Sequence, residues 1–129
     1  MKKLQRKSAI VIAVLATNVV TVFTFAEPAS AAFQCNGTTL NAGGQVCIDY
    51  DPQGYRAGYQ TSLSPRGDWM DFNLRCDSGA VFGTYGAFLA NKSSQWYTYV
   101  FKVGSQGRCH VTLYDRSTGG QTDSPSVTR

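Results

Sequence analysis

The sequence predicts an all-β fold, a small antiparallel β-sandwich or partly open barrel held by two disulfide bonds. Apolar and polar residues alternate, most clearly in WMDFNLRC at 69–76, and no segment shows a helical period. Clusters of Gly, Pro, Asn, Asp and Ser recur at short intervals, which is typical of short strands joined by turns. Four cysteines follow residue 34, and an even number in a small exported chain indicates disulfide bonds.

The first residues have the layout of a secretory signal. Basic residues at 2–7 precede an uncharged, mostly apolar run at 9–26, and the small residues Ala29 and Ala31 form a cleavage site. A run of about 18 uncharged residues is also long enough for a membrane anchor, but one asparagine and three threonines dilute its apolarity. We expect residues 1–31 to be removed and residues 32–129 to form a single secreted, extracellular domain.

Removal of this signal changes the charge of the protein. The whole chain has 12 Lys and Arg against 8 Asp and Glu, a net charge of +4. Four of these bases and one of these acids lie in residues 1–31. Residues 32–129 therefore keep eight basic and seven acidic residues, a net charge of +1. Nucleic-acid binding needs clustered basic residues. We therefore expect no nucleic-acid partner, and no membrane contact once the signal is cleaved.

The first two expected strands, 45–50 and 55–61, are joined by the turn DPQG. Its Asp, Pro and Gly each suit the turn position that they occupy. The acids around this turn also resemble a calcium loop. Such a loop needs an acid at its twelfth position, which is Gln60 here, and a helix on each side. We therefore expect a turn without a metal, and the sequence indicates no other cofactor.

The next two expected strands are 69–76 and 80–88. In the first, two sets of side chains face opposite ways: Met70, Phe72, Leu74 and Cys76 on one face, and Trp69, Asp71, Asn73 and Arg75 on the other. In the second, Gly83 and Gly86 interrupt the pattern, which indicates a bulge or a close approach of backbone.

A hairpin is expected near the end of the chain. Residues 95–103 and 109–115 flank a five-residue loop with two glycines. Placing Val103 opposite Cys109 builds one buried face and one outer face. The outer face would carry Trp96, Thr98, Val100, Lys102, His110, Thr112 and Tyr114. The remaining segment, 117–129, is polar, and we expect a frayed, flexible C-terminal tail.

Four cysteines allow three disulfide connectivities. The sequence favours Cys35–Cys47, which closes a short glycine-rich loop, and Cys76–Cys109, which joins two expected strands on their apolar face. Zinc is the alternative, but the closest cysteines are twelve residues apart. Zinc sites usually contain a much shorter pair of ligands.

No constellation of residues predicts catalysis. His110 is the only histidine, no serine lies in a G-x-S-x-G motif, and the expected hairpin places Lys102 opposite His110. Residues 32–129 contain no Glu, so a glycosidase would need two aspartates, and none of the aspartate pairs carries a motif. We expect a protein that is not an enzyme.

Aromatic residues are abundant, and most must fill the core of so small a domain. Exposed rings can also stack on sugars or anchor a protein partner. Trp96 and Tyr114, with His110 beside them, are the candidate binding residues on the expected outer hairpin face. The alternative is that a second sheet or a loop covers that face.

The stretches WMDFNLRC, GAF and YVFKVGSQGRCHVTLYDR resemble small secreted proteins of filamentous soil bacteria, many of which have no assigned activity. The resemblance covers roughly residues 46–115 and consists of strand and turn patterns. It implies export and an all-β domain, and it transfers no functional residue.

These observations favour a small secreted, monomeric, non-catalytic binding protein whose ligand is an extracellular polysaccharide or another protein. The alternative is a secreted protease inhibitor or antimicrobial factor. A rigid loop such as NGTTLNAGG or SLSPRGD could then present an inhibitory segment. A small hydrolase is the third hypothesis.

Overall fold

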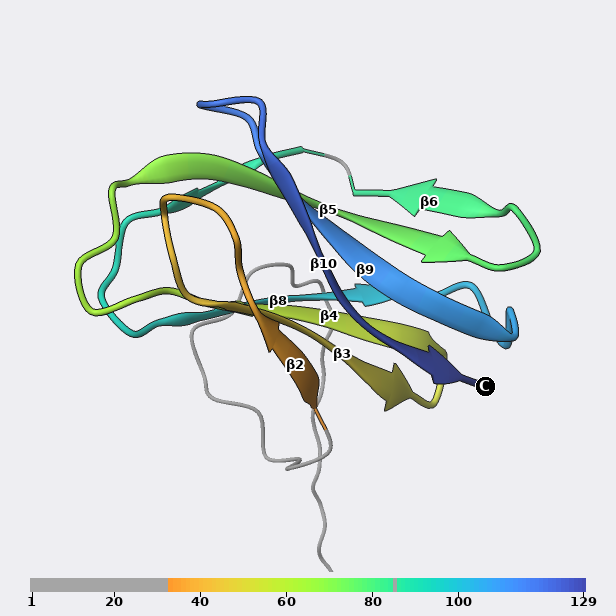
Figure 1. Cartoon of the computed structure of the whole chain (residues 1–129). Coiled ribbons are helices and arrows are strands. Elements are labelled where there is room, and N and C mark those ends of the chain that lie inside the picture. Colours follow the sequence, from red (N-terminus) through yellow and green to blue (C-terminus); the bar gives the residue numbers. More distant parts are fainter. Residues whose placement is uncertain (1–32, 85) are drawn as a thin grey trace, which may run out of the picture.

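The computed structural model describes residues 33–84 and 86–129. These residues form nine strands in two antiparallel sheets, without a helix, which confirms the predicted all-β fold (Figure 1). The strands are β2 (Gln34–Gly37), β3 (Gln45–Asp51), β4 (Gly54–Gln60), β5 (Asp68–Cys76), β6 (Val81–Gly83), β7 (Phe88–Ala90), β8 (Trp96–Phe101), β9 (Arg108–Asp115) and β10 (Gln121–Thr128). The predicted signal, residues 1–31, lies outside the described residues. Within the described residues, no helix could cross a membrane.

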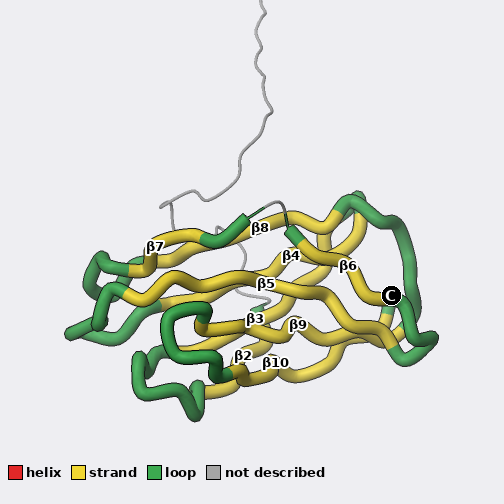
Figure 2. Tube along the Cα trace, turned by 90° about the horizontal axis from the view of Figure 1, so that it is seen from above, coloured by secondary structure: helices red, strands yellow, loops and turns green. Residues whose placement is uncertain are grey.

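The two sheets lie one above the other. The first sheet has the strand order β2-β3-β4-β8. The second has the order β10-β9-β5-β6, and β7 also pairs with β5. Seen from above, the strands of both layers run along the same long direction, with loops at the two ends (Figure 2). The layers approach each other beside β2 and β10, where the Asn36 side chain donates to the Asp123 carbonyl oxygen at 3.1 Å.

The predicted alternation along β5 is confirmed. Met70, Phe72 and Leu74 are fully buried between the sheets, and they pack in one core with residues of the first sheet. The ring of Phe88 lies 5.1 Å from that of Phe72 and 5.1 Å from that of Tyr97, so aromatic contacts join the two layers. Burial of these apolar side chains is the main source of stability in a domain of this size.

The predicted hairpin between β8 and β9 is wrong. Strand β8 pairs with β4, whereas β9 pairs with β5 and β10, so the two strands lie in different sheets. The link between them crosses from one layer to the other, and contacts at its two ends hold it. The Gly104 amide donates to the Gln53 carbonyl at 2.8 Å, and Gly107 and Arg129 exchange backbone hydrogen bonds at 3.1 Å. Both glycines have positive φ, 70° and 77°, which suits a crossing as well as a hairpin loop.

The prediction of a frayed C-terminal tail is also wrong, because residues 121–128 form β10 along the edge of the second sheet. The strand is polar in sequence but well bonded. The Ser124 hydroxyl accepts from the Val111 amide at 2.8 Å, and Val127 is buried. The register shifts between Asp123 and Ser126, which accommodates Pro125, a residue that cannot donate to a ladder.

The single strand expected at 80–88 is instead two short strands. β6 and β7 pair with different parts of β5, on either side of the interruption that the two glycines predict. Strand β2 was not expected from the sequence. It pairs with β3 and places Cys35 directly opposite Cys47.

Both predicted disulfides are present. Cys35–Cys47 joins β2 to β3 in the first sheet, and Cys76–Cys109 joins β5 to β9 in the second. The predicted turn between β3 and β4 is also confirmed. The Asp51 carboxylate accepts from the Gln53 amide at 2.9 Å, which closes the turn.

Candidate functional site

The three candidate binding residues lie on two different sheets. Trp96 is in β8 of the first sheet, whereas His110 and Tyr114 are in β9 of the second. The expected pairing of His110 with Lys102 is wrong. His110 lies opposite Arg75 on one side and Ser126 on the other. The structure therefore brings His110 and Tyr114 together and separates both from Trp96.

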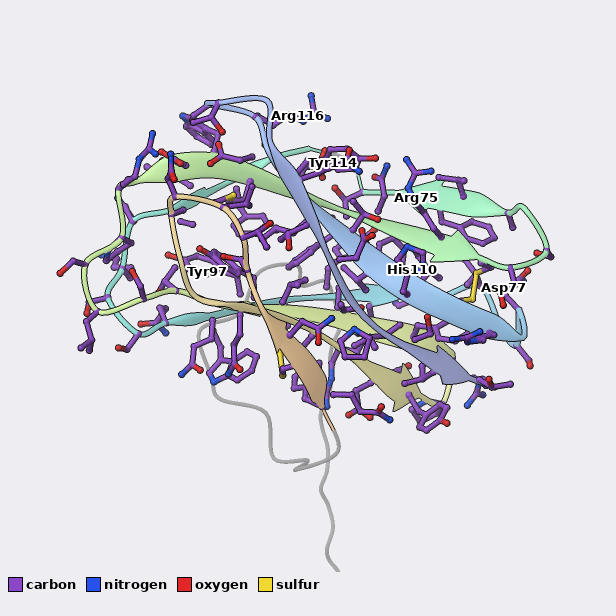
Figure 3. All side chains as sticks on the ribbon, in the orientation of Figure 1. Arg75, Asp77, Tyr97, His110, Tyr114 and Arg116 are labelled. Atoms are coloured by element: carbon purple, nitrogen blue, oxygen red, sulfur yellow. A yellow bond between two sulfur atoms is a disulfide. The ribbon has the colours of Figure 1, made fainter. Side chains whose placement is uncertain are left out.

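Residues of neighbouring strands, most of them polar or aromatic, form rows on the side of the second sheet that faces away from the core. We call this surface, together with Arg116, the outer face of the second sheet. Residues that lie opposite one another across the strands form four rows. The first contains Val81, Arg75, His110 and Ser126, and the second contains Gly83, Asn73, Thr112 and Asp123. The third contains Asp71, Tyr114 and Gln121, and the fourth contains Leu89 and Trp69. Figure 3 shows Arg75, Tyr114 and Arg116 along this side of the molecule, with Tyr97 between the layers.

Arg75 and Tyr114 hold each other in place on neighbouring strands. The Arg75 guanidinium donates from Nη2 to the Tyr114 hydroxyl, and its Cζ lies 6.0 Å from the centre of the Tyr114 ring. This distance is at the limit for an attraction between a cation and an aromatic face. Both side chains are half-buried, so a ligand would meet an aromatic ring and a cation whose positions are already fixed.

Asp71 is almost fully buried although it lies on the outer face, because two side chains cover it. The Thr84 hydroxyl donates to Oδ1, and Arg116 donates from Nη2 to Oδ2 at 2.6 Å. The Arg116 side chain itself remains 62% exposed. One guanidinium nitrogen is therefore anchored by a charge-assisted hydrogen bond, while the exposed part of the guanidinium faces solvent.

His110 belongs to a second polar group on β9 and β10. Its Nε2 lies 3.8 Å from the Asp123 carboxylate, which is beyond hydrogen-bond length. The same carboxylate accepts from the Thr112 hydroxyl at 2.7 Å. His110, Thr112 and Asp123 therefore lie together as one polar group on this face.

Trp69 is the largest exposed aromatic side chain of this face, with half of its surface accessible. The alternation along their strand predicted that Trp69, Asp71 and Arg75 point outward, but none of them was among the candidate binding residues. The pattern that could have identified them is the alternation at 69–76, because its outward-facing residues include an aromatic and two charged side chains. Arg116 lies beyond the strand and had no such signal, because its contact with Asp71 joins residues 45 positions apart.

Trp96 has a different environment on the outer side of the first sheet. It stacks on Phe33 with ring centres 5.2 Å apart and an angle of 6°. The Arg56 guanidinium carbon lies 4.7 Å from the centre of the Phe33 ring. The same guanidinium forms a salt bridge with the Asp49 carboxylate at 2.8 Å. Both rings cover Gly58, where a Cβ atom would lie 2.8 Å from the Phe33 ring. Trp96 therefore contributes to packing over this sheet.

Among residues 33–84 and 86–129, no three His, Cys, Asp or Glu side chains are grouped as metal ligands. Comparison with known proteins adds no assignment. No family model matches the chain, and neither a curated protein nor a solved structure matches it significantly. The resemblance to small secreted proteins of soil bacteria therefore stays a prediction.

Proposed function

We propose that this chain is an extracellular, monomeric, non-catalytic binding protein that holds polysaccharide on the outer face of the second sheet. The two disulfides support an oxidising compartment outside the cell. The N-terminal signal expected from the sequence would deliver the protein there.

The observation that carries the proposal is the combination of an exposed indole with fixed polar groups on one face of a sheet. A sugar ring offers an apolar face of C–H groups and a rim of hydroxyls. Trp69 supplies a half-exposed ring for the apolar face. Arg75, Arg116 and Tyr114 supply oriented groups for the hydroxyls, through the contacts described above.

The surface is also organised before a ligand arrives. Asp71 holds Arg116, and Tyr114 holds Arg75, so these long side chains lose little rotational freedom on binding. Ordering such a side chain ordinarily costs about 0.5–1.5 kcal/mol, which a fixed side chain avoids. A weak contact with each sugar unit would then add up along a chain.

Retention of the oxidised, exported protein on insoluble chitin, cellulose and bacterial cell wall tests the proposal. We expect retention on at least one of them and a loss of about tenfold or more in affinity for Trp69→Ala, because Trp is enriched among the residues that contribute most to binding energy. Trp96→Ala is the matched control and should retain binding. Absence of retention on all three materials, or loss with Trp96→Ala alone, would contradict the proposal.

A secreted antagonist is the second candidate, favoured by the loop at 61–67. Leu63 is 81% exposed in this loop. The loop is nevertheless tethered: the Ser93 hydroxyl donates to the Leu63 carbonyl at 2.6 Å, and the Ser94 amide donates to the Ser62 carbonyl at 2.9 Å. An exposed apolar side chain on a tethered backbone could fill a pocket of a partner. Inhibition of chymotrypsin that Leu63→Ala removes would support this candidate, and no inhibition by the natural protein would reject it for that protease.

A further inference from the structure

Two buried carboxyl groups lie directly behind the exposed end of the outer face. Asp68 is 5% exposed and Asp115 is 1% exposed. Side chains alternate along a strand, so Asp68 points inward where its neighbour Trp69 points outward. Asp115 likewise points inward next to Arg116. Asp115 lies opposite Met70 in the β5–β9 pair, so the two carboxyls come from neighbouring strands.

Each of these carboxyls has one buried oxygen without a hydrogen-bond donor. Asp68 Oδ2 and Asp115 Oδ2 have no partner among the described residues. The other oxygen of Asp115 accepts from the backbone amides of Ser117 and Thr118 at 2.9 and 3.2 Å. An unsatisfied buried oxygen costs free energy, and one proton held between two adjacent carboxyls satisfies both oxygens and removes the repulsion between two charges.

We propose that Asp68 and Asp115 share one proton, and that this proton positions Trp69 and Arg116 for ligand binding. The second half of this inference rests on the proposed function of the outer face. The first half does not. Asp68 and Asp115 are positioning residues, because neither side chain reaches the outer face.

The neighbouring charges agree with a shared proton. The Asp115 carboxyl, which can form a hydrogen bond with Asp68 once one of the two carries a proton, raises the pKa of Asp68. Burial and the negative charge of Asp115 raise this pKa further, and Arg66, whose Nε lies 3.6 Å from Asp68 Oδ1, lowers it. On the first sheet, Tyr59 faces the pair, and burial, the charges of Asp115 and Asp68, and then Tyr97 raise its pKa to about 12. Tyr59 is therefore neutral at physiological pH, and its hydroxyl donates to the Gly43 carbonyl at 2.9 Å.

Backbone contacts connect the pair to the outer face. The Arg116 amide donates to the Trp69 carbonyl at 2.7 Å, and the Trp69 amide donates to the Ser117 hydroxyl at 2.9 Å. Loss of the shared proton would leave two buried negative charges at the adjoining ends of β5 and β9. Their repulsion would separate these ends and displace Trp69 from Arg116. Binding should therefore be strong below the raised pKa and weaker above it.

A pH titration of the whole oxidised protein by NMR tests the shared proton without any ligand. We expect the side-chain carboxyl carbon of Asp68 to follow a step above the ordinary range of aspartate, with the resonances of Asp115 and of the Trp69 indole responding at the same pH. In Asp68→Asn, whose amide donates permanently to Asp115, the indole resonance should no longer move in that pH range. Asp77→Asn is the matched control, because Asp77 is exposed, and it should leave the step of Asp68 in place.

Titration of Asp68 in the ordinary range, with no response of Asp115 at the same pH, would overturn the shared proton, and a stationary indole resonance would overturn the coupling to the outer face. Retention on chitin, cellulose and cell wall across the same pH range supplies the second readout. Affinity should fall about fivefold or more through the step, the lower end of ordinary coupling between sites, and Asp68→Asn should abolish this fall. If no retention occurs at any pH, the proposed function fails, whereas the NMR result still decides the shared proton.

Discussion

The two disulfides should stabilise the protein unequally, and the structure gives the order. Cys76–Cys109 closes a separation of 33 residues and Cys35–Cys47 one of 12. In the chain-entropy account, these bridges contribute about 3.7 and about 2.8 kcal/mol at 25 °C, because the longer loop loses more freedom in the unfolded chain. Replacing both cysteines of a pair by alanine should therefore cost about 0.9 kcal/mol more for the longer loop.

Packing should increase this difference. Cys76 and Cys109 belong to the hydrophobic core cluster, so removal of their sulfur atoms also leaves a cavity between the sheets. Cys47 is fully buried but lies outside that cluster, and its partner Cys35 is only half-buried. Removal of Cys76–Cys109 should therefore reduce the free energy of unfolding more, because its loop is longer and because its sulfur atoms lie in the core.

Urea unfolding of the oxidised protein and the two double variants, followed by fluorescence, measures the effect as a change in the free energy of unfolding. Equal losses of unfolding free energy in the two double variants, or a larger loss in the variant that combines Cys35→Ala with Cys47→Ala, would refute the reasoning from loop length and burial. A change in the slope of the transition would show that the denatured state had changed as well, and the comparison would then be made at the midpoints.

Two further changes probe the interior and the first sheet. Because the folded state raises the pKa of Asp68, it binds protons more tightly than the unfolded chain, so stability should fall as pH rises from about 3.9 through the raised value. Asp68→Asn should remove this fall in a series of thermal unfolding midpoints against pH, and an unchanged pH profile would contradict it. Gly58→Ala should cost about 1–3 kcal/mol in urea unfolding, because its Cβ would meet the rings of Phe33 and Trp96 at 2.8 and 3.1 Å. An unaltered midpoint would show that the rings are not held there.

Local patterns in the sequence predicted the local features of the fold. The alternation at 69–76 correctly separated Met70, Phe72 and Leu74 from Trp69 and Arg75, because the direction of a side chain depends only on its own strand. The turn after Asp51 was likewise predictable from the residues that form it.

Pairing between distant strands was the part that the sequence did not reveal. Two glycines at 104 and 107 suit both a hairpin and a crossing between layers, and the choice depends on contacts with Gln53 and Arg129 far along the chain. Strand β10 was missed because an edge strand can be polar: its partners are backbone groups of β9. These pairings decide which side chains meet, so the candidate site was predicted only in its β9 half.

The central claim, that the outer face of the second sheet binds polysaccharide, is tested most directly by NMR mapping. Soluble oligosaccharides prepared from the retained polysaccharide would be titrated into the labelled, oxidised protein. We expect the largest changes in the resonances of Trp69, Arg75 and Tyr114. Changes confined to Trp96 and its neighbours on the first sheet, or to the loop at 61–67, would contradict the claim.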